Sequence, residues 1–183
     1  DDIRIAVNDK ADMIQLDGLQ GSSGAAPDTT VDHLGIPTIC GLVNAIRSLQ
    51  EMGWSGRIDI VVMGGIRNGA DAAKAIALGA DAVSVGMGSL MAMGCVGCLQ
   101  CFTGRCPVGI AAQDPELTRL LDIDEAAEGV FNYLTAMNEE IKHICASLGK
   151  RDIRELNRED LQAMTIDVSA MTGLPLVGTG VAY

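Results

Sequence analysis

The sequence predicts an α/β fold built on a parallel sheet. Two continuous apolar runs, 58–63 and 81–85, are separated by one alanine-rich helical pattern at 69–78. Each run ends in glycines, at Gly64-Gly65 and at Gly86-Met87-Gly88. A strand, a helix and a second strand in this order place the two strands parallel in one sheet, and continuous apolar strands are typical of a sheet covered on both faces. Ligands of such sheets bind at the carboxyl ends of the strands.

Composition limits the class of protein. The 183 residues include 48% hydrophobic residues, which is enough for one domain with a core. The net charge of −11 argues against nucleic acid as a partner, because phosphates repel an acidic surface. No apolar run is long enough to span a membrane, and the start has neither an initiator Met nor a signal-peptide pattern. We therefore expect a cytoplasmic protein whose chain begins inside a larger polypeptide.

The first part of the chain predicts a helix end, a strand and a loop. Residues 2–9 are typical of the end of a helix, and the apolar run at 11–16 predicts a short strand. The strand leads into the glycine-rich stretch 17–27, whose small side chains allow the backbone to approach a flat or phosphorylated ligand. His33 follows this loop, and we expect it to take part in packing rather than to bind a ligand.

The next two helices have clear beginnings and ends. Apolar residues at three- and four-residue steps predict a helix over 37–52, with Pro37 at its first position and Gly53 as its stop. Asn68 is placed to cap the helix at 69–78, which Gly79 ends. The glycines that follow strands 58–63 and 81–85 then occupy equivalent positions on neighbouring strands. Their N–H groups could converge on one phosphate; the alternative is that they only form tight turns.

The last third of the chain predicts helices and a tail. One apolar stripe runs along a helix over 125–148, with Asp124 as its cap and Gly149 as its stop, and this pattern indicates packing. His143 lies off the stripe and is expected on the surface. Two short helices joined at Asn157 are predicted within 150–164. Residues 165–183 are a small apolar tail to which we assign no element.

Four cysteines within twelve residues predict a metal site. Cys95, Cys98, Cys101 and Cys106 form the pattern C-x2-C-x2-C-x4-C-P, which differs by one residue from the ferredoxin pattern. The chain lacks the second distant pair that a zinc ribbon would use, so iron–sulfur is favoured over zinc and over redox or incidental thiols. Disulfides between cysteines this close would form small strained rings. The other two cysteines lie singly within predicted helices.

With these motifs in place, the chain resembles the FMN-binding synthase domain of the glutamate synthases, most closely the archaeal-type short form. The matching stretches span about residues 2–164. They are Gly21-Ser-Ser-Gly-Ala-Ala-Pro27, Gly35-Ile-Pro37, Gly64-Gly-Ile-Arg-Asn-Gly69, Ala77-Leu-Gly-Ala-Asp81, Gly94-Cys95, Cys101 with Cys106-Pro-Val-Gly109, and Gln113-Asp-Pro115.

The resemblance implies the C-terminal portion, about strands 6 to 8, of a (βα)8 barrel. Residues 1–110 would form this part and include an iron–sulfur loop at 94–107. Residues 111–164 would be a helical extension of the same domain, and 165–183 the tail. Three strands cannot close a barrel, so we expect another chain or segment to supply the rest.

The resemblance also implies the site. Cys95, Cys101 and Cys106 correspond to the ligands of a 3Fe–4S cluster, and Cys98 adds a fourth thiol that would allow a 4Fe–4S cluster. The glycine loops would hold the FMN phosphate, and loop 17–24 would line the flavin and substrate. The cofactor-binding candidates are Gly21, Gly64, Gly65, Gly86, Met87 and Gly88, and the candidates for catalytic contacts to the substrate are Asp17 and Gln20.

The implied activity is reduction of 2-iminoglutarate, formed from 2-oxoglutarate and ammonia, to glutamate. The electron donor would be ferredoxin or an NAD(P)H-oxidising subunit. Two alternatives remain open: an N-methylglutamate synthase-type subunit, and a non-catalytic iron–sulfur subunit for electron transfer or scaffolding. The sequence leaves the donor, the ammonia source, the cluster type and the oligomeric state undetermined.

Overall fold

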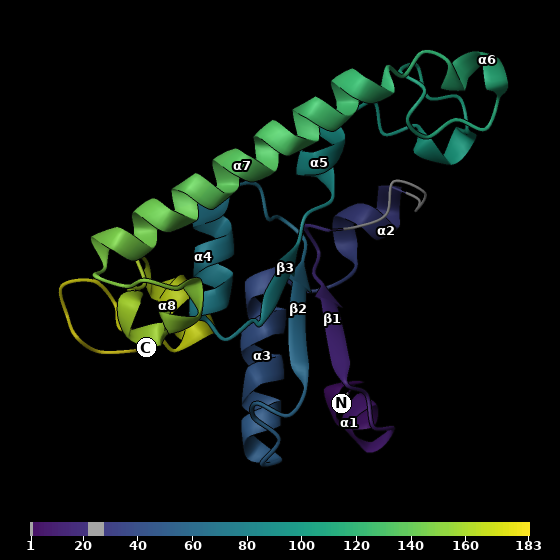
Figure 1. The fold of residues 1–183 in the computed structure, drawn as a ribbon. Coiled ribbons are helices and arrows are strands. Elements are labelled where there is room, and N and C mark those ends of the chain that lie inside the picture. The colour runs from purple at the N-terminus through teal and green to yellow at the C-terminus, as the bar shows by residue number, and fades with distance from the viewer. Residues whose placement is uncertain (1, 22–27) are drawn as a thin grey trace.

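The computed structural model describes residues 2–21 and 28–183, in which helices alternate with three strands (Figure 1). The elements in order are α1 (Asp2–Asn8), β1 (Met13–Asp17), α2 (Asp28–His33), α3 (Thr38–Glu51), β2 (Asp59–Met63), α4 (Gly69–Ala77), β3 (Ala82–Ser84), α5 (Met87–Ala92), η1 (Cys101–Thr103), α6 (Pro115–Thr118), α7 (Ile123–Ser147), η2 (Ile153–Glu155), η3 (Arg158–Asp160) and α8 (Ile166–Thr172). None of the described helices has the length and apolar character needed to cross a membrane.

The three strands form a parallel sheet in the order β1-β2-β3, as the sequence predicts. Asp17 is aligned with Met63, and Met63 with Ser84. The carboxyl ends of all three strands therefore lie at one edge of the sheet. The loops that follow them, which carry the predicted cofactor and substrate residues, start side by side.

Helices cover one face of this sheet. Ile60 and Val62 of β2 are fully buried in the same apolar cluster as Leu42 and Leu49 of α3 and Leu78 after α4 (Figure 1). Each such side chain stabilises the fold by about 1.5–3 kcal/mol when it leaves water. This layer holds the strands and the helices that follow them in one rigid unit, so the loops at the strand ends start from fixed points.

The opposite face of the sheet is more open than the sequence predicts. On β1, Met13, Gln15 and Asp17 are exposed, while the residues between them pack on the core. Strand β3 was expected to be buried, but Ala82 is exposed and its neighbours are only half-buried. The prediction of two covered faces is wrong for the described residues, because α3 and α4 pack on one face and β3 has a neighbour on one edge only.

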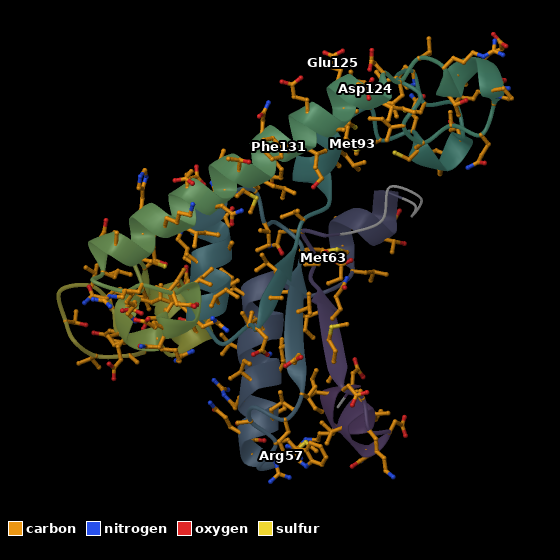
Figure 2. All side chains as sticks on the ribbon, viewed as in Figure 1. Arg57, Met63, Met93, Asp124, Glu125 and Phe131 are labelled. Carbon is orange, nitrogen blue, oxygen red and sulfur yellow. The ribbon has the colours of Figure 1, made fainter. Side chains whose placement is uncertain are left out.

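Helix α7 is the longest element and packs on α4 and α5. It runs from the cysteine-containing segment to the C-terminal segment (Figure 1). Its cap is Asp122 rather than Asp124, because the Asp122 carboxylate accepts hydrogen bonds from the N–H groups of Asp124 (3.0 Å) and Glu125 (3.1 Å). Phe131 (Figure 2) is 68% exposed, so α7 buries only part of its apolar surface.

Four short α-helices were not predicted, nor was the single turn of helix η1. They are α2, α5, α6 and α8, each of four to seven residues, which is too short for a helical period to stand out. Helix α8 lies in the stretch expected as a tail, and it packs on α3. The buried hydroxyl of Ser169 donates a hydrogen bond to the carbonyl of Leu174 at 2.6 Å, which fixes the segment after α8.

Smaller differences concern single residues. Pro37 is the residue before α3 and not its first helical position. His33 is exposed at the end of α2, so the expected packing role is wrong. His143 is exposed, as predicted. The two short helices around Asn157 are confirmed as η2 and η3, and the Asn157 side chain caps η3.

Candidate functional site

The loop after β2 packs against the loop after β1. Gly64 and Gly65 have φ values of +103° and +77°, which residues other than glycine rarely adopt. A Cβ on Gly64 would lie 2.8 Å from the backbone nitrogen of Gly21, and a Cβ on Gly65 would lie 3.1 Å from the Gln20 Cβ. Three predicted cofactor-binding glycines are therefore brought together, and this close approach requires glycine at 64 and 65.

The predicted substrate contacts lie on the same loop. Gln20 Oε1 accepts hydrogen bonds from the backbone N–H (2.9 Å) and the hydroxyl (2.8 Å) of Thr38, so this oxygen caps α3. Asp17 is exposed at the end of β1, and its carboxylate lies directly beside Gly21. The structure thus gives Gln20 a positioning contact and leaves Asp17 at the strand end. Residues 22–24 of the loop predicted to line the flavin and substrate fall outside the described residues.

The loop after β3 begins α5. Gly86 precedes this helix, and no atom lies within 4 Å of the position its Cβ would take. Met87 is 49% exposed. Gly88 is enclosed, because a Cβ there would lie 2.3 Å from the Tyr133 hydroxyl oxygen. Gly86 therefore has open space beside it for a ligand. Position 88 has room only for glycine, because the Tyr133 side chain from α7 occupies the space that a Cβ would need.

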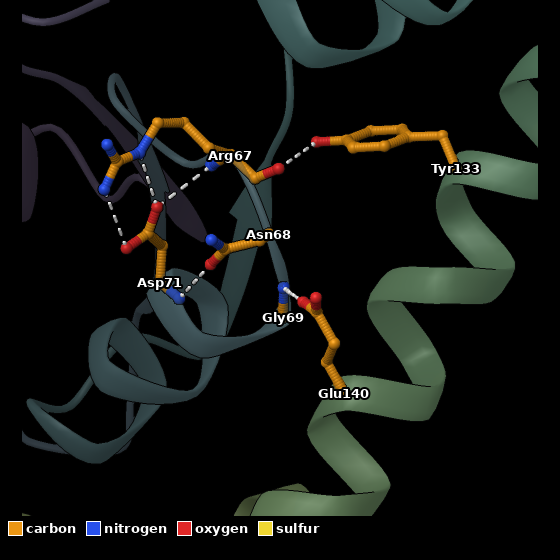
Figure 3. A network of polar contacts seen from close by, with 6 residues as sticks. All are labelled: Arg67, Asn68, Gly69, Asp71, Tyr133 and Glu140. Atoms are coloured by element: carbon orange, nitrogen blue, oxygen red, sulfur yellow. Dashed lines mark hydrogen bonds and ion pairs between the residues drawn. The ribbon is translucent and has the colours of Figure 1, made fainter.

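The glycine-rich turn between β2 and α4 is fixed by a polar network (Figure 3). Asn68 Oδ1 caps α4 by accepting from Asp71 N at 2.9 Å, as predicted, and Arg67 Nε donates to Asp71 at 2.9 Å. From α7, Glu140 accepts from Gly69 N at 2.6 Å. Two N–H groups at the start of α4 are therefore bonded within the protein.

The network also sets the charge of Asp71. Burial, the largest single influence, raises the pKa of its carboxyl, but the hydrogen bond and positive charge of Arg67 together outweigh it. The net pKa of Asp71 is lowered.

Sequence reasoning missed Tyr133 and Glu140. Tyr133 donates to the Arg67 carbonyl at 3.1 Å, and Glu140 binds the Gly69 N–H (Figure 3). The available signal was their spacing of seven residues, which places two polar side chains on one side of a long helix. That side contacts the loops of the predicted phosphate site.

A cavity lies beside the first pair of glycines. Its volume is about 580 Å³, and it opens between the strand-end loops and helices α3, α4 and α8. Gln20, Gly64, Gly65 and Arg67 are among its lining residues. The rest of its lining is mostly apolar, which is typical of a small-molecule site with a few polar contacts.

The four clustered cysteines line a second, small cavity. Its volume is about 30 Å³, and its walls include Met87 and Leu90 as well as Cys95, Cys98, Cys101 and Cys106. Cys98 and Cys101 are exposed, Cys95 is half-buried and Cys106 is buried. All four predicted thiols therefore line one small cavity, next to the stretch that carries Gly86 and Gly88, but they do not converge within ligand distance of one point.

Backbone N–H groups surround the buried thiol of Cys106. The backbone N–H groups of Ala111 and Val108 lower the pKa of its thiol, because they stabilise the negative sulfur against the opposing effect of burial. Thiolates are the ligands that iron–sulfur clusters require. The donor set thus fits such a cluster in its chemistry.

The cavity itself has room for about two water molecules, so the loop has to open to take in a cluster. Within residues 2–21 and 28–183, no three His, Cys, Asp or Glu side chains lie close enough together to hold one metal ion. All six cysteines are free, and disulfides are absent among them.

Solved structures share this fold. A flavocytochrome b2 variant with pyruvate bound matches with a TM-score of 0.53 at 20% identity, over 86% of this chain and 31% of that protein. A mandelate oxidase variant with an FMN adduct matches with a TM-score of 0.53 at 25% identity, over 85% of this chain and 37% of that protein. Both matches support the α/β fold with a parallel sheet.

Curated relatives are closer in sequence. An archaeal-type glutamate synthase (NADPH) of Thermotoga neapolitana is 43% identical over 94% of this chain and 34% of its own length. An archaeal glutamate synthase (NADPH) of Methanocaldococcus jannaschii is 39% identical over 97% of this chain and 35% of its own length. A glutamate synthase large subunit-like protein of Rhizobium meliloti is 39% identical over 97% of this chain and 44% of its own length. The chain spans between about a third and just under half of these relatives.

A family profile covers most of the chain. The profile described as the conserved region in glutamate synthase matches residues 1–151. This range contains all three strands, both glycine loops, the cysteine segment and α7. The predicted resemblance is confirmed, and the chain belongs to the glutamate synthase family.

Proposed function

We propose that this chain is the part of an FMN- and iron–sulfur-dependent glutamate synthase that holds the flavin phosphate and the cluster. The activity of the whole enzyme would be reduction of 2-iminoglutarate to glutamate. The observation that carries the proposal is the cavity lined by all four thiols and by Met87. Met87 lies between Gly86 and Gly88, two of the glycines predicted to hold the phosphate. A cluster bound there would lie next to the flavin phosphate, so electrons could pass between the two cofactors.

The phosphate site is proposed at the ends of β2 and β3. Gly64 and Gly65 follow one strand, and Gly86, Met87 and Gly88 follow its parallel neighbour. Backbone N–H groups of such loops bind phosphate without a side chain in between. Because N–H groups of α4 are already bonded to Asn68 and Glu140, we assign the phosphate to the glycine loops, with Gly21 packed behind them.

The cluster site is proposed at the cysteine segment. Cys95, Cys101 and Cys106 would bind a 3Fe–4S cluster, and Cys98 would complete the ligands of a 4Fe–4S cluster. When bound, the cluster supplies one-electron transfer and FMN converts single electrons to hydride transfer. The protein residues hold the thiolates together, and the backbone N–H groups of residues 108–111 stabilise the sulfur of Cys106.

The substrate would lie above loop 17–21. In the overall reaction, 2-oxoglutarate and ammonia lose water to form the imine, which then takes up two electrons and two protons to give glutamate. Asp17 is the proposed polar contact at the strand end. Gln20 acts through Thr38, because its amide oxygen fixes this loop to the start of α3. The electrons would come from ferredoxin or from an NAD(P)H-oxidising subunit.

The rest of the barrel is proposed to come from another segment or chain. Two features support this: β1 and β3 each pair on one edge only, and Met13, Gln15 and Asp17 on the uncovered face are exposed. The chain would supply about strands 6 to 8 of a (βα)8 barrel. The proposed divisions of the chain are the barrel part at 1–110, the helical extension at 111–164 and the tail at 165–183. Six free cysteines are compatible with the reducing cytoplasm.

The proposed activity is tested with the holoenzyme, 2-oxoglutarate and either ammonia or glutamine. We expect glutamate to form only when reduced ferredoxin or NADPH is consumed with it. Product that depends on methylamine and needs no reductant would show an N-methylglutamate synthase instead. A visible spectrum with the iron–thiolate shoulder but without flavin bands would show the non-catalytic iron–sulfur subunit.

A further inference from the structure

Helix α7 packs directly on backbone at the predicted cofactor site. A Cβ on Gly129 would lie 2.1 Å from the carbonyl oxygen of Ala92, at the end of α5. A Cβ on Gly69 would lie 2.4 Å from the carbonyl oxygen of Met137, and Glu140 accepts a hydrogen bond from Gly69 N at 2.6 Å. These contacts fix α7 against the start of α4 and the end of α5.

Tyr133 lies between these two contact points. Its hydroxyl donates a hydrogen bond to the carbonyl of Arg67, in the loop after β2, at 3.1 Å (Figure 3). The same oxygen would lie 2.3 Å from a Cβ on Gly88, in the glycine stretch 86–88 that leads from β3 into the start of α5. One hydroxyl therefore touches both glycine loops. Burial raises the pKa of this phenol, as do the charges of Asp71 and Glu140, so Tyr133 keeps its proton as a donor at neutral pH.

We propose that Tyr133 is a positioning residue that fixes the spacing of the two glycine loops and so shapes the phosphate cradle. This inference rests on the proposed function, in which the N–H groups of both loops bind one phosphate. The loops come from different strands, and several N–H groups can converge on one phosphate only if the spacing is kept. Tyr133 touches backbone of each loop and leaves the cradle itself free for the ligand.

Gly88 is explained by the same contact. Any side chain at position 88 would displace the Tyr133 hydroxyl from the Arg67 carbonyl. A ligand site whose shape is set before binding loses less free energy in ordering when the ligand arrives. We therefore expect removal of the hydroxyl to weaken binding of the phosphate group in particular, and to leave binding of the flavin ring unaffected.

The experiment compares FMN with riboflavin, which lacks the phosphate. Apoprotein prepared from the holoenzyme is titrated with each flavin for wild type, Tyr133→Phe and the matched control Tyr183→Phe, which removes the hydroxyl of the other tyrosine in the chain. We expect Tyr133→Phe to weaken FMN binding by up to about fivefold, because the lost spacing of the loops cannot cost more than the hydrogen bond that held it, with riboflavin binding unchanged. Tyr183→Phe should match wild type with both flavins.

Two results with Tyr133→Phe would overturn the proposal. One is unchanged FMN binding by this variant. The other is an equal loss of affinity for FMN and riboflavin, because that result would mean that the substitution destabilises the whole protein and does not act on the phosphate. A wild-type protein that binds FMN and riboflavin equally would overturn the phosphate cradle itself, and the proposal with it. The wild-type comparison thus separates failure of the proposed function from failure of the role of Tyr133.

Discussion

At the scale of single residues, two buried thiols differ in what surrounds them. Cys106 lies on the cysteine cavity, and backbone N–H groups lower its pKa. Cys145 is equally buried, but it packs in the apolar cluster between α4 and α7. The sequence separated them only by spacing. Pro107 and Gly109 mark the turn after Cys106, but only the folded structure shows that this turn buries the Cys106 thiol.

The first prediction uses this pair. In the holoenzyme, Cys106→Ala should lose most of the bound iron and the visible absorbance of the cluster, while Cys145→Ala should keep both. Iron analysis and the visible spectrum measure this. Full iron content in Cys106→Ala would contradict the assignment. Cys98→Ala tests the fourth thiol, because full iron content in this variant would show that Cys98 is not needed to hold the cluster.

The second prediction concerns pH and Asp71. The hydrogen bond from Arg67 gives Asp71 a lower pKa in the folded state than in the unfolded state, despite burial. Its stabilisation is therefore complete above the unfolded pKa of about 3.9 and is lost as the pH falls through the folded value. Wild type should be more stable than Asp71→Asn in urea at pH 7, and this difference should shrink below about pH 4. Replacing Arg67 by Gln should remove much of the pH dependence. A difference that grows as the pH falls would show that the sign is wrong.

At the scale of elements, two helical glycines have opposite surroundings. Gly41 lies inside α3, and the nearest atoms to its Cβ position are those of Ile36 at 3.8 Å. Gly129 lies inside α7, with the Ala92 carbonyl oxygen 2.1 Å away. Both glycines weaken an isolated helix equally, so the difference between them is entirely one of packing.

The third prediction follows from this contrast. Gly41→Ala should stabilise the protein by about 0.5–1 kcal/mol, because alanine restricts the unfolded chain and meets no obstacle. Gly129→Ala should destabilise it by about 1–3 kcal/mol, because α5 and α7 must move apart. Urea denaturation measures both. Equal effects of the same sign would mean that α7 does not pack on α5 as described.

Elements differed in how far sequence could predict them. The sheet strands, α3, α4 and α7 follow from apolar periods and from Asn68 and Gly149 at helix ends. Helices α5 and α8 have six and seven residues, fewer than two full turns, and so give no period. The caps at Pro37 and Asp122 shifted by one or two residues, which is the usual uncertainty of helix ends.

At the scale of the whole molecule, the candidate site combines local and distant parts. The cysteine pattern and the paired glycines are local, and both could be predicted. The contact of Tyr133 with Arg67 joins residues 66 positions apart, and the capping of α3 by Gln20 joins residues 18 apart. Only the packing of α7 and of the loop after β1 brings these groups together, so sequence reasoning placed Gln20 at the substrate and overlooked Tyr133.

In the proposed holoenzyme, the cysteine segment binds iron beside a phosphate held by the loops after β2 and β3. Anomalous X-ray diffraction at the iron edge, on crystals of the holoenzyme, locates both groups in one experiment. We expect iron peaks bonded to the sulfurs of Cys95, Cys101 and Cys106, with the FMN phosphate at Gly64–Gly65 and Gly86–Gly88. Iron bound elsewhere, or a flavin phosphate at the amino ends of the strands, would contradict this proposal.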